Sequence, residues 1–241
     1  MQEAMNLSIE KRLNANYKIV SIIKSNEKAK ITRLRNEALS RDIIMREFTG
    51  SGESYKKLLS VRQKNLPETY DVFNEQDKCI VLEEFIDGTT VADILFSDLY
   101  TERGAAIVGS EVCNALFTLH STNIIHRDIK PENIMVTSSG RVVLIDLGAA
   151  RIFKNSGGSD TFIVGTAGYA APEQFGFSES DPRTDIFSLG VTLNVMLTGR
   201  HPSEQLYGGK LGKVIARCIK FSPDRRFSSA AELKQTLQKF I

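Results

Sequence analysis

Four polar residues at short intervals carry side chains that could together perform phosphoryl transfer. Asp128 and Lys130 lie two residues apart. Asn133 follows three residues after the lysine, and Asp146 comes thirteen residues after Asn133. One carboxylate can orient an attacking hydroxyl and accept its proton, and a lysine can neutralise charge on a phosphate. An amide and a second carboxylate supply the oxygen ligands that Mg²⁺ shares with phosphates. The alternative interpretation is a solvated turn after a helix, with Asp146 merely ending a buried strand.

The elements that must position these residues change in type along the chain. Alternating apolar residues and turn residues predict an antiparallel meander in the first part. Spacings of three and four predict helices in the second part. We expect strands over 17–23, 29–35, 41–48, 69–74 and 78–84, after a polar leading segment, 1–16. We expect helices over 53–62, 91–95, 102–121, 185–197, 211–220 and 229–240.

Two of the expected helices have distinctive patterns. Segment 185–197 is apolar on nearly every face, which predicts a buried helix. Ser228-Ser229 can cap the last helix, and Glu232 follows three residues after Ser229, the spacing of a capping box.

Composition is that of a globular protein. The chain has 241 residues, 41% of them hydrophobic and 25% charged, enough for one large domain or two small lobes. A net charge of +2 gives no argument for nucleic acid. Cys79, Cys113 and Cys218 lie far apart among apolar neighbours, which predicts buried free thiols rather than disulfides or zinc ligands. No window resembles a signal peptide or membrane span, so we expect a soluble, cytoplasmic protein.

The motifs around the four polar residues resemble those of a known family. HRDIKPEN at 126–133 with DLG at 146–148 resembles the catalytic loop and metal-binding turn of protein kinases. GTAGYAAPEQ at 165–174 resembles the end of a kinase activation segment. With strands first and helices second, the chain resembles a bacterial eukaryotic-like Ser/Thr protein kinase over roughly residues 17–239.

This resemblance implies an α+β, two-lobed fold. The N-lobe, 17–84, would be small and mainly antiparallel β with one short helix. The C-lobe, 85–241, would be larger and mainly α-helical.

The resemblance also implies roles for the four polar residues. Asp128, Lys130 and Asn133 would be catalytic, with Lys130 near the transferred phosphate. Asn133 and Asp146 would hold Mg²⁺, or Mn²⁺ in its place, against the phosphates of ATP.

Other roles follow from the same resemblance. VLEEFIDG at 81–88 resembles the hinge, so the backbone of Glu84 and Ile86 would meet the adenine. Glu83 then stands at the gatekeeper position, where an apolar residue is usual. Lys130 and Thr166 imply Ser/Thr rather than Tyr substrates.

Three further residues match structural positions of the family. Asp185, followed by Gly190, matches the buried-helix aspartate that holds the catalytic-loop backbone. Arg226 in SPDRRF matches the arginine that pairs with the glutamate of the APE motif, here Glu173.

Arg127, next to Asp128, implies regulation by a phosphate on the activation loop. The candidate phosphosites are Ser156, Ser159 and Thr161, with unmodified loop hydroxyls as the alternative.

The N-terminal part departs from the family pattern. KSNEKAKI at 24–31 replaces all three glycines of the phosphate loop, by Lys24, Asn26 and Ala29. DIIMR places Arg46 where the family has a lysine that grips the nucleotide phosphates, and this exchange is not conservative. Glu53 is the best candidate for the partner of that residue. It is equally compatible with an ordinary carboxylate at a helix start.

Two hypotheses follow for the function. The first is an active Ser/Thr kinase of protein substrates that binds ATP weakly. Arg46, or a relocated Lys24, Lys28 or Lys30, would contact the nucleotide phosphates in place of the missing lysine. The second is a pseudokinase that acts as a binding or scaffold module. The sequence does not name the substrate, the regulator or the oligomeric state.

Overall fold

The computed structural model describes residues 16–75, 77–153, 165–175 and 179–241. The chain forms two compact units, which are described separately. Unit 1 contains the residues up to Arg62 together with Pro67–Phe85. Unit 2 contains Gln63–Leu66 and Ile86–Ile241. The predicted leading segment lies outside the described residues, except for Asn16.

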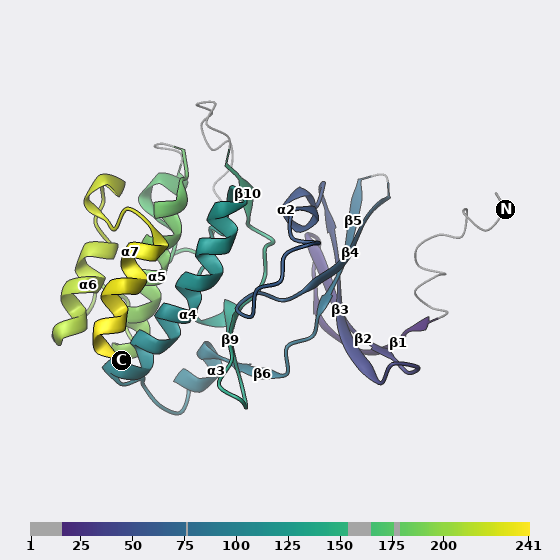
Figure 1. Ribbon diagram of the computed structural model, residues 1–241, viewed down its shortest axis with the longest axis horizontal. Coiled ribbons are helices and arrows are strands. Elements are labelled where there is room, and N and C mark those ends of the chain that lie inside the picture. Colours follow the sequence, from purple (N-terminus) through teal and green to yellow (C-terminus); the bar gives the residue numbers. More distant parts are fainter. Residues whose placement is uncertain (1–15, 76, 154–164, 176–178) are drawn as a thin grey trace. The chain divides into compact units, whose positions relative to one another are not determined.

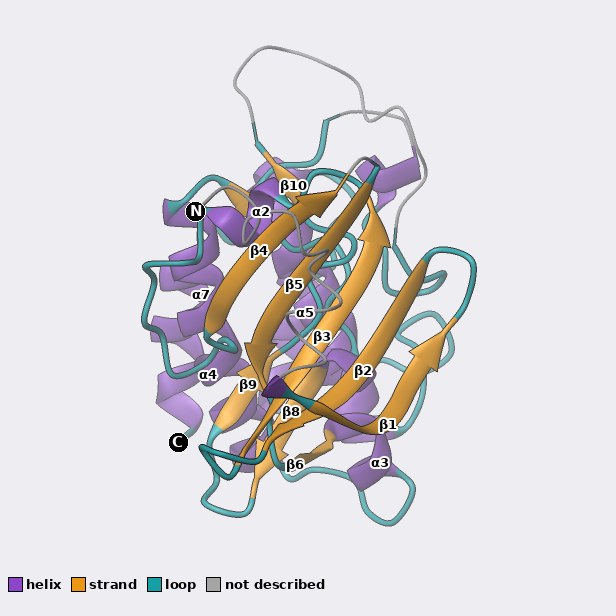
Figure 2. Cartoon of the chain, turned by 90° about the vertical axis from the view of Figure 1, so that its right-hand side faces the viewer, coloured by secondary structure: helices purple, strands orange, loops and turns teal. Residues whose placement is uncertain are grey.

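Unit 1 is built on a five-stranded antiparallel sheet (Figure 2). Its strands are β1 (Lys18–Ser25), β2 (Ala29–Asn36), β3 (Arg41–Thr49), β4 (Thr69–Glu75) and β5 (Lys78–Glu84). They lie in the order β1-β2-β3-β5-β4, so β1 and β4 form the edges. The five predicted strands are confirmed with small shifts at their ends, and so is the antiparallel pairing of the first three.

The period of two along each strand gives this sheet two different faces. On one face, buried residues form an apolar cluster: Leu34, Ile43, Ile80 and Leu82. The opposite face carries Ile44 and Val81, also buried, together with the charged side chains of Arg46 and Glu83. Two oppositely charged side chains are therefore buried beside apolar residues on this face.

The helix of unit 1 is shorter than predicted. α2 covers only Glu53–Lys56, not the expected 53–62. Its N-cap is Gly52, in a left-handed conformation (φ 60°) and without a side chain that could cap the first turn. Beyond Lys56 the chain continues in tight turns, for example with the N–H of Leu58 donating to the carbonyl of Tyr55 (2.9 Å). A helical turn this short is held by the burial of Tyr55 and Leu58, not by its own hydrogen bonds.

Unit 2 is mainly α-helical, so the α+β class is confirmed. Its helices are α3 (Val91–Leu95), α4 (Glu102–Ser121), α5 (Pro182–Thr198), α6 (Lys210–Cys218) and α7 (Ala230–Leu237). Its short strands are β6 (Gly88–Thr90), β7 (Ile124–Ile125), β8 (Ile134–Thr137), β9 (Val142–Leu144) and β10 (Arg151–Ile152). The five helices predicted for this part of the sequence are all present.

Helix α5 lies at the centre of unit 2. It packs against α4, α6 and α7 (Figure 1), and twelve of its residues are buried, as its apolar sequence predicts. Gly190 permits the close approach of α6, because a Cβ at this position would lie 2.4 Å from the Cβ of Cys218. A capping box of Asp181 and Thr184 starts the helix.

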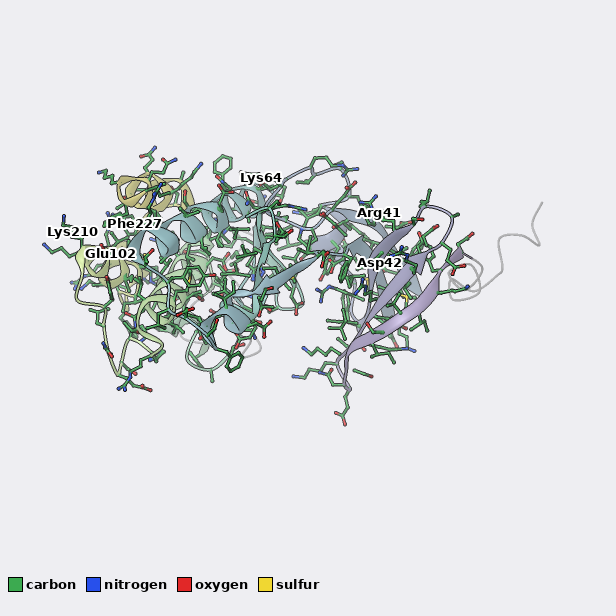
Figure 3. The ribbon with its side chains drawn as sticks, turned by 90° about the horizontal axis from the view of Figure 1, so that it is seen from below. Arg41, Asp42, Lys64, Glu102, Lys210 and Phe227 are labelled. Atoms are coloured by element: carbon green, nitrogen blue, oxygen red, sulfur yellow. The ribbon has the colours of Figure 1, made fainter. Side chains whose placement is uncertain are left out.

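Side chains at helix starts connect further elements of unit 2. The carboxylate of Glu102, in the first turn of α4, accepts a hydrogen bond from the backbone N–H of Leu211 (2.8 Å), beside Lys210 at the start of α6 (Figure 3). Ser229 caps α7 as predicted. Glu232 accepts the N–H of the preceding Ser228 (2.8 Å), and its own N–H donates to the Ser229 hydroxyl (3.2 Å).

Cys79, Cys113 and Cys218 are free and buried, as predicted. Within the described ranges, no helix has the length and apolar character needed to cross a membrane.

Candidate functional site

The loop between β7 and β8 is held in place by a buried carboxylate of α5. Asp185 accepts hydrogen bonds from the backbone N–H groups of His126 (2.9 Å) and Arg127 (2.8 Å). The Nε2 atom of His120 lies 2.8 Å from the same carboxylate. Burial by itself would raise the pKa of Asp185, but the hydrogen bond and charge of His120, with smaller contributions from His126, hold it below its ordinary value. This carboxylate is therefore ionised at neutral pH, and both of its oxygens have hydrogen-bonding partners.

Arg127 has an unusual backbone conformation for a long side chain. Its φ of 64° lies in the left-handed region. The N–H of Arg127 is bound by Asp185, and its carbonyl accepts a hydrogen bond from Nε2 of Gln174 (2.9 Å). Two separate elements, α5 and the 3-10 turn Pro172–Phe175, thus maintain the bend that precedes Asp128.

Asp128 is the centre of a compact hydrogen-bonded cluster. Nδ2 of Asn133 donates to the Asp128 carbonyl (2.8 Å) and to its Oδ2 (2.9 Å). Nζ of Lys130 lies 3.0 Å from the same Oδ2. Thr166 donates its hydroxyl to Oδ1 (2.7 Å) and accepts from Lys130 (2.5 Å). Both oxygens of Asp128 are therefore oriented by neighbouring side chains.

Asp146 lies in the turn that follows β9. Its φ of 68° is again left-handed, a conformation that aspartate tolerates better than most residues. Its Oδ1 accepts the N–H of Gly148 (3.0 Å). The preceding residue, Ile145, donates its N–H to the carbonyl of Asn133 (2.8 Å), so the backbone brings the turn against the Asp128 cluster.

The oxygen atoms of Asn133 and Asp146 suit a hard cation such as Mg²⁺. Because the Nδ2 group of Asn133 is directed at Asp128, the amide oxygen points away from that carboxylate. In the described parts of the chain, no group of three or more His, Cys, Asp or Glu side chains could hold a metal ion.

In unit 1, the ion pairs differ from the expected Arg46–Glu53 pair. Nε of Arg46 binds Oε1 of Glu83, and both side chains are buried. The carboxylate of Glu53 instead binds Lys56, one helical turn along α2 (2.8 Å), and is half exposed. The contacts of Glu53 match the second of its two alternatives, an ordinary carboxylate at a helix start, and the carboxylate beside Arg46 comes from the sheet.

The segment that replaces the glycine-rich loop is a tight turn. Oδ1 of Asn26 accepts the N–H groups of Lys28 (3.0 Å) and Ala29 (2.9 Å). The N–H of Asn26 donates to the carbonyl of Ala29 (3.0 Å). This asparagine side chain satisfies backbone donors that an open glycine loop would leave for a ligand. Of the alternative lysines, Lys30 lies near Glu47 (3.7 Å).

The two expected hinge residues are placed as follows. Glu84 uses its backbone N–H to bind the carbonyl of Glu68 (2.8 Å) within unit 1. Ile86 begins the second part of unit 2 and is buried. The guanidinium of Arg33 lies over the ring of Phe85, 4.0 Å from its centroid.

The remaining expected residues divide into two groups. Glu173 and Arg226 are buried and form an ion pair. The candidate phosphosites Ser156, Ser159 and Thr161 lie outside the described residues. Burial and the charge of Arg151 lower the pKa of Arg127, and Arg151 itself lies 3.5 Å from the carboxylate of Glu179.

Sequence reasoning missed the roles of His120 and Gln174 and the partnership of Glu83. Glu83 stood out in the sequence as a charged residue at the end of the apolar run Cys79–Leu82, but its partner could not be read from the local pattern. Nothing in the local pattern around His120 or Gln174 distinguishes them from ordinary surface residues.

Comparison with known proteins agrees with this architecture. The family model described as "Protein kinase domain" matches residues 9–241. Serine/threonine-protein kinase PknB of Mycobacterium tuberculosis is 32% identical over 184 residues, covering 65% of this chain and 29% of the relative. Serine/threonine-protein kinase D of Synechocystis is 31% identical, covering 86% and 44%. A probable serine/threonine-protein kinase of Clostridium perfringens is 29% identical, covering 90% and 35%. The chain thus spans less than half the length of these curated relatives.

Proposed function

Because the chain belongs to the protein kinase family, we propose that it transfers the γ-phosphoryl group of ATP to serine and threonine hydroxyls of protein substrates. Residues 17–84 and 85–241 would be the N- and C-lobes of one kinase domain. The observation that carries the proposal is the Asp128 cluster, in which Lys130, Asn133 and Thr166 together orient one carboxylate.

The proposed step follows from the hydrogen bonds of Asp128. The substrate hydroxyl oxygen forms a bond to the γ-phosphorus, while the bond from this phosphorus to the β–γ bridging oxygen breaks and ADP leaves. The proton of the hydroxyl passes to Asp128, whose carboxylate can accept more hydrogen bonds than its protein neighbours use. Lys130 neutralises charge that spreads over the transferred phosphate.

Asn133 and Asp146 would hold Mg²⁺, which supplies neutralisation of the phosphate charge when it is bound. Arg46 would contact the nucleotide phosphates in place of the usual lysine. The carbonyl of Glu84 and the backbone N–H of Ile86 would bind the adenine.

We further propose that a phosphate on Ser156, Ser159 or Thr161 would pair with Arg127 and order the activation loop. Use of ATP and three free thiols also fits a reducing, cytoplasmic location.

A second candidate function is that of a pseudokinase. The turn closed by Asn26 favours it, because backbone N–H groups that could bind phosphates are already bonded within the chain. Weak nucleotide affinity would follow. The assembled Asp128 cluster favours the active kinase.

The deciding experiment is intact-mass spectrometry after incubation with Mg·ATP and a generic Ser/Thr substrate protein. We expect phosphate on the substrate with the parent and none with Asp128→Asn. Asp98→Asn, which changes an exposed carboxylate of the same type, should behave as the parent. Absence of phosphate transfer at high enzyme and nucleotide concentrations would favour the pseudokinase.

A further inference from the structure

His201 joins two segments of unit 2 that are 33 residues apart in the chain. It lies in the connection between α5 and α6, residues 199–209. Its Nε2 atom lies 2.8 Å from the backbone carbonyl of Gly168. Its Nδ1 atom accepts the N–H of Ser203 (3.2 Å). Because one nitrogen of a neutral imidazole is an acceptor and the other carries the proton, Nε2 is the donor to Gly168.

Gly168 lies at the tip of a tight turn. The N–H groups of Tyr169 (3.0 Å) and Ala170 (3.1 Å) both donate to the carbonyl of Thr166. Gly168 has a φ of 91°, a conformation that favours glycine at this position of a turn. Both Gly168 and the preceding Ala167 are exposed. The tip is therefore held by a side chain from another segment, in addition to the backbone hydrogen bonds of the turn itself.

The turn adjoins the proposed catalytic carboxylate. Thr166, its first residue, donates its hydroxyl to Oδ1 of Asp128 (2.7 Å). A substrate hydroxyl that reaches Asp128 brings the neighbouring residues of its own chain with it, because consecutive Cα atoms are about 3.8 Å apart. Gly168 is two residues from Thr166, so the exposed tip lies within reach of the residues that flank the phosphoacceptor.

The loop that carries His201 is itself held by a buried residue of α5. Nδ2 of Asn194 donates to the carbonyls of Arg200 (2.9 Å) and Gln205 (2.8 Å). Oδ1 of Asn194 accepts the N–H of Tyr207 (2.9 Å). The asparagine is fully buried, and its amide is bonded on both sides. These hydrogen bonds fix the position of the His201 loop relative to α5.

We infer that His201 is a positioning residue for the turn Thr166–Tyr169, and through this turn for binding of the protein substrate. This inference rests on the proposed function, since it takes the substrate to lie against the turn. Without the His201 contact, the turn would keep its backbone hydrogen bonds, but its tip would lose the connection to the loop that α5 holds. The substrate would then meet a more variable surface, while Thr166 would still orient Asp128.

Two amide substitutions separate the contact with Gly168 from the local contact with Ser203. An asparagine amide can accept the N–H two residues further on, as Nδ1 does, but it is too short to reach Gly168. A glutamine amide can place an N–H donor near the position of Nε2. His201→Asn should therefore lose the contact with the turn, and His201→Gln is the matched control that retains it.

The first measurement is hydrogen exchange of the turn, followed by mass spectrometry without nucleotide or substrate. His201→Asn should accelerate amide exchange in the peptide that contains Tyr169 and Ala170 by about three- to tenfold, the equivalent of one hydrogen bond. His201→Gln should exchange at the rate of the parent. Unchanged exchange in His201→Asn, or equal acceleration in both variants, would overturn the inference.

The second measurement is steady-state kinetics at saturating Mg·ATP, with myelin basic protein as the phosphoacceptor. His201→Asn should raise the KM for this protein by about three- to tenfold, while kcat and the KM for ATP stay within about twofold of the parent's. His201→Gln should restore the KM. A lower kcat with an unchanged KM would overturn the inference, because His201 would then act on the chemical step.

Failure of the inference and failure of the proposed function give different results. An active parent whose KM for the protein is insensitive to His201→Asn would overturn the inference and leave the kinase activity intact. A parent that transfers no phosphate would overturn the proposed function, together with the substrate part of the inference. The exchange measurement would still decide whether His201 holds the turn.

Discussion

Arg226 holds both carboxylate oxygens of Glu173 through its two terminal nitrogens, at 2.7 and 2.8 Å. Both side chains are almost fully buried. The remaining donors of the guanidinium reach backbone carbonyls, and Thr184 donates its hydroxyl to the same glutamate (2.8 Å). The ion pair thus connects the 3-10 turn Pro172–Phe175 to the segment before α7. Both of its charges are compensated by the ion pair itself and by these hydrogen bonds.

Arg226→Ala should lower the free energy of unfolding by about 3–5 kcal/mol, because it leaves the buried charge of Glu173 uncompensated. Urea unfolding followed by circular dichroism would measure the change. The neighbouring Arg225 is exposed, so Arg225→Ala should stay within about 0.5 kcal/mol of the parent. Equal stability of the two variants would show that the ion pair contributes little.

Asp185 should make stability depend on pH in the acid range. Its pKa in the folded protein lies below the ordinary value of 3.8, since the hydrogen bonds and charges of His120 and His126 outweigh the effect of burial. The unfolded chain therefore takes up this proton first as the pH falls. The stabilisation is complete above about pH 4 and is lost as the pH falls through the folded pKa.

Urea unfolding of the parent and of Asp185→Asn, from about pH 7 to about pH 3, would test this expectation. The stability difference between the two proteins should shrink as the pH falls below about 4. A difference that stays constant throughout would contradict the lowered pKa.

Thr166 should matter for the rate of phosphoryl transfer more than for stability. Thr166→Val keeps the shape but removes the hydroxyl that joins Lys130 to Asp128. Loss of this orientation should lower the single-turnover rate by about 10- to 100-fold. Thr166→Ser, which retains the hydroxyl, is the matched control and should remain close to the parent. If both variants were equally slow, the methyl group and not the hydrogen bonds would be important.

Asp146→Asn should abolish the dependence of nucleotide affinity on Mg²⁺ while the fold stays intact. Asparagine tolerates the left-handed φ of this position, so the turn should survive. Loss of the carboxylate charge removes the strongest proposed ligand for the cation. ATP affinity measured with Mg²⁺ and with EDTA would report the change. An unaltered Mg²⁺ effect in the variant would exclude Asp146 from the metal site.

Much of the fold could be predicted because its information is local. The alternation of apolar residues predicted the strands of unit 1, and the continuous apolar surface of 185–197 predicted the buried α5. The types and spacing of Asp128, Lys130, Asn133 and Asp146 are likewise fixed along the chain, and the roles proposed for them rest on that pattern.

Partners distant in sequence depended on the tertiary structure. Arg46 and Glu83 are 37 residues apart, and only the register of β3 against β5 brings them together. The sequence also left two alternatives open for Glu53, and the structure places its carboxylate on Lys56 within the four-residue helix α2. Residue types and short spacings can be read directly from consecutive positions of the sequence. The partner of a buried charge such as Arg46 is determined only by the tertiary structure, because strand pairing and burial bring together residues that are distant in sequence.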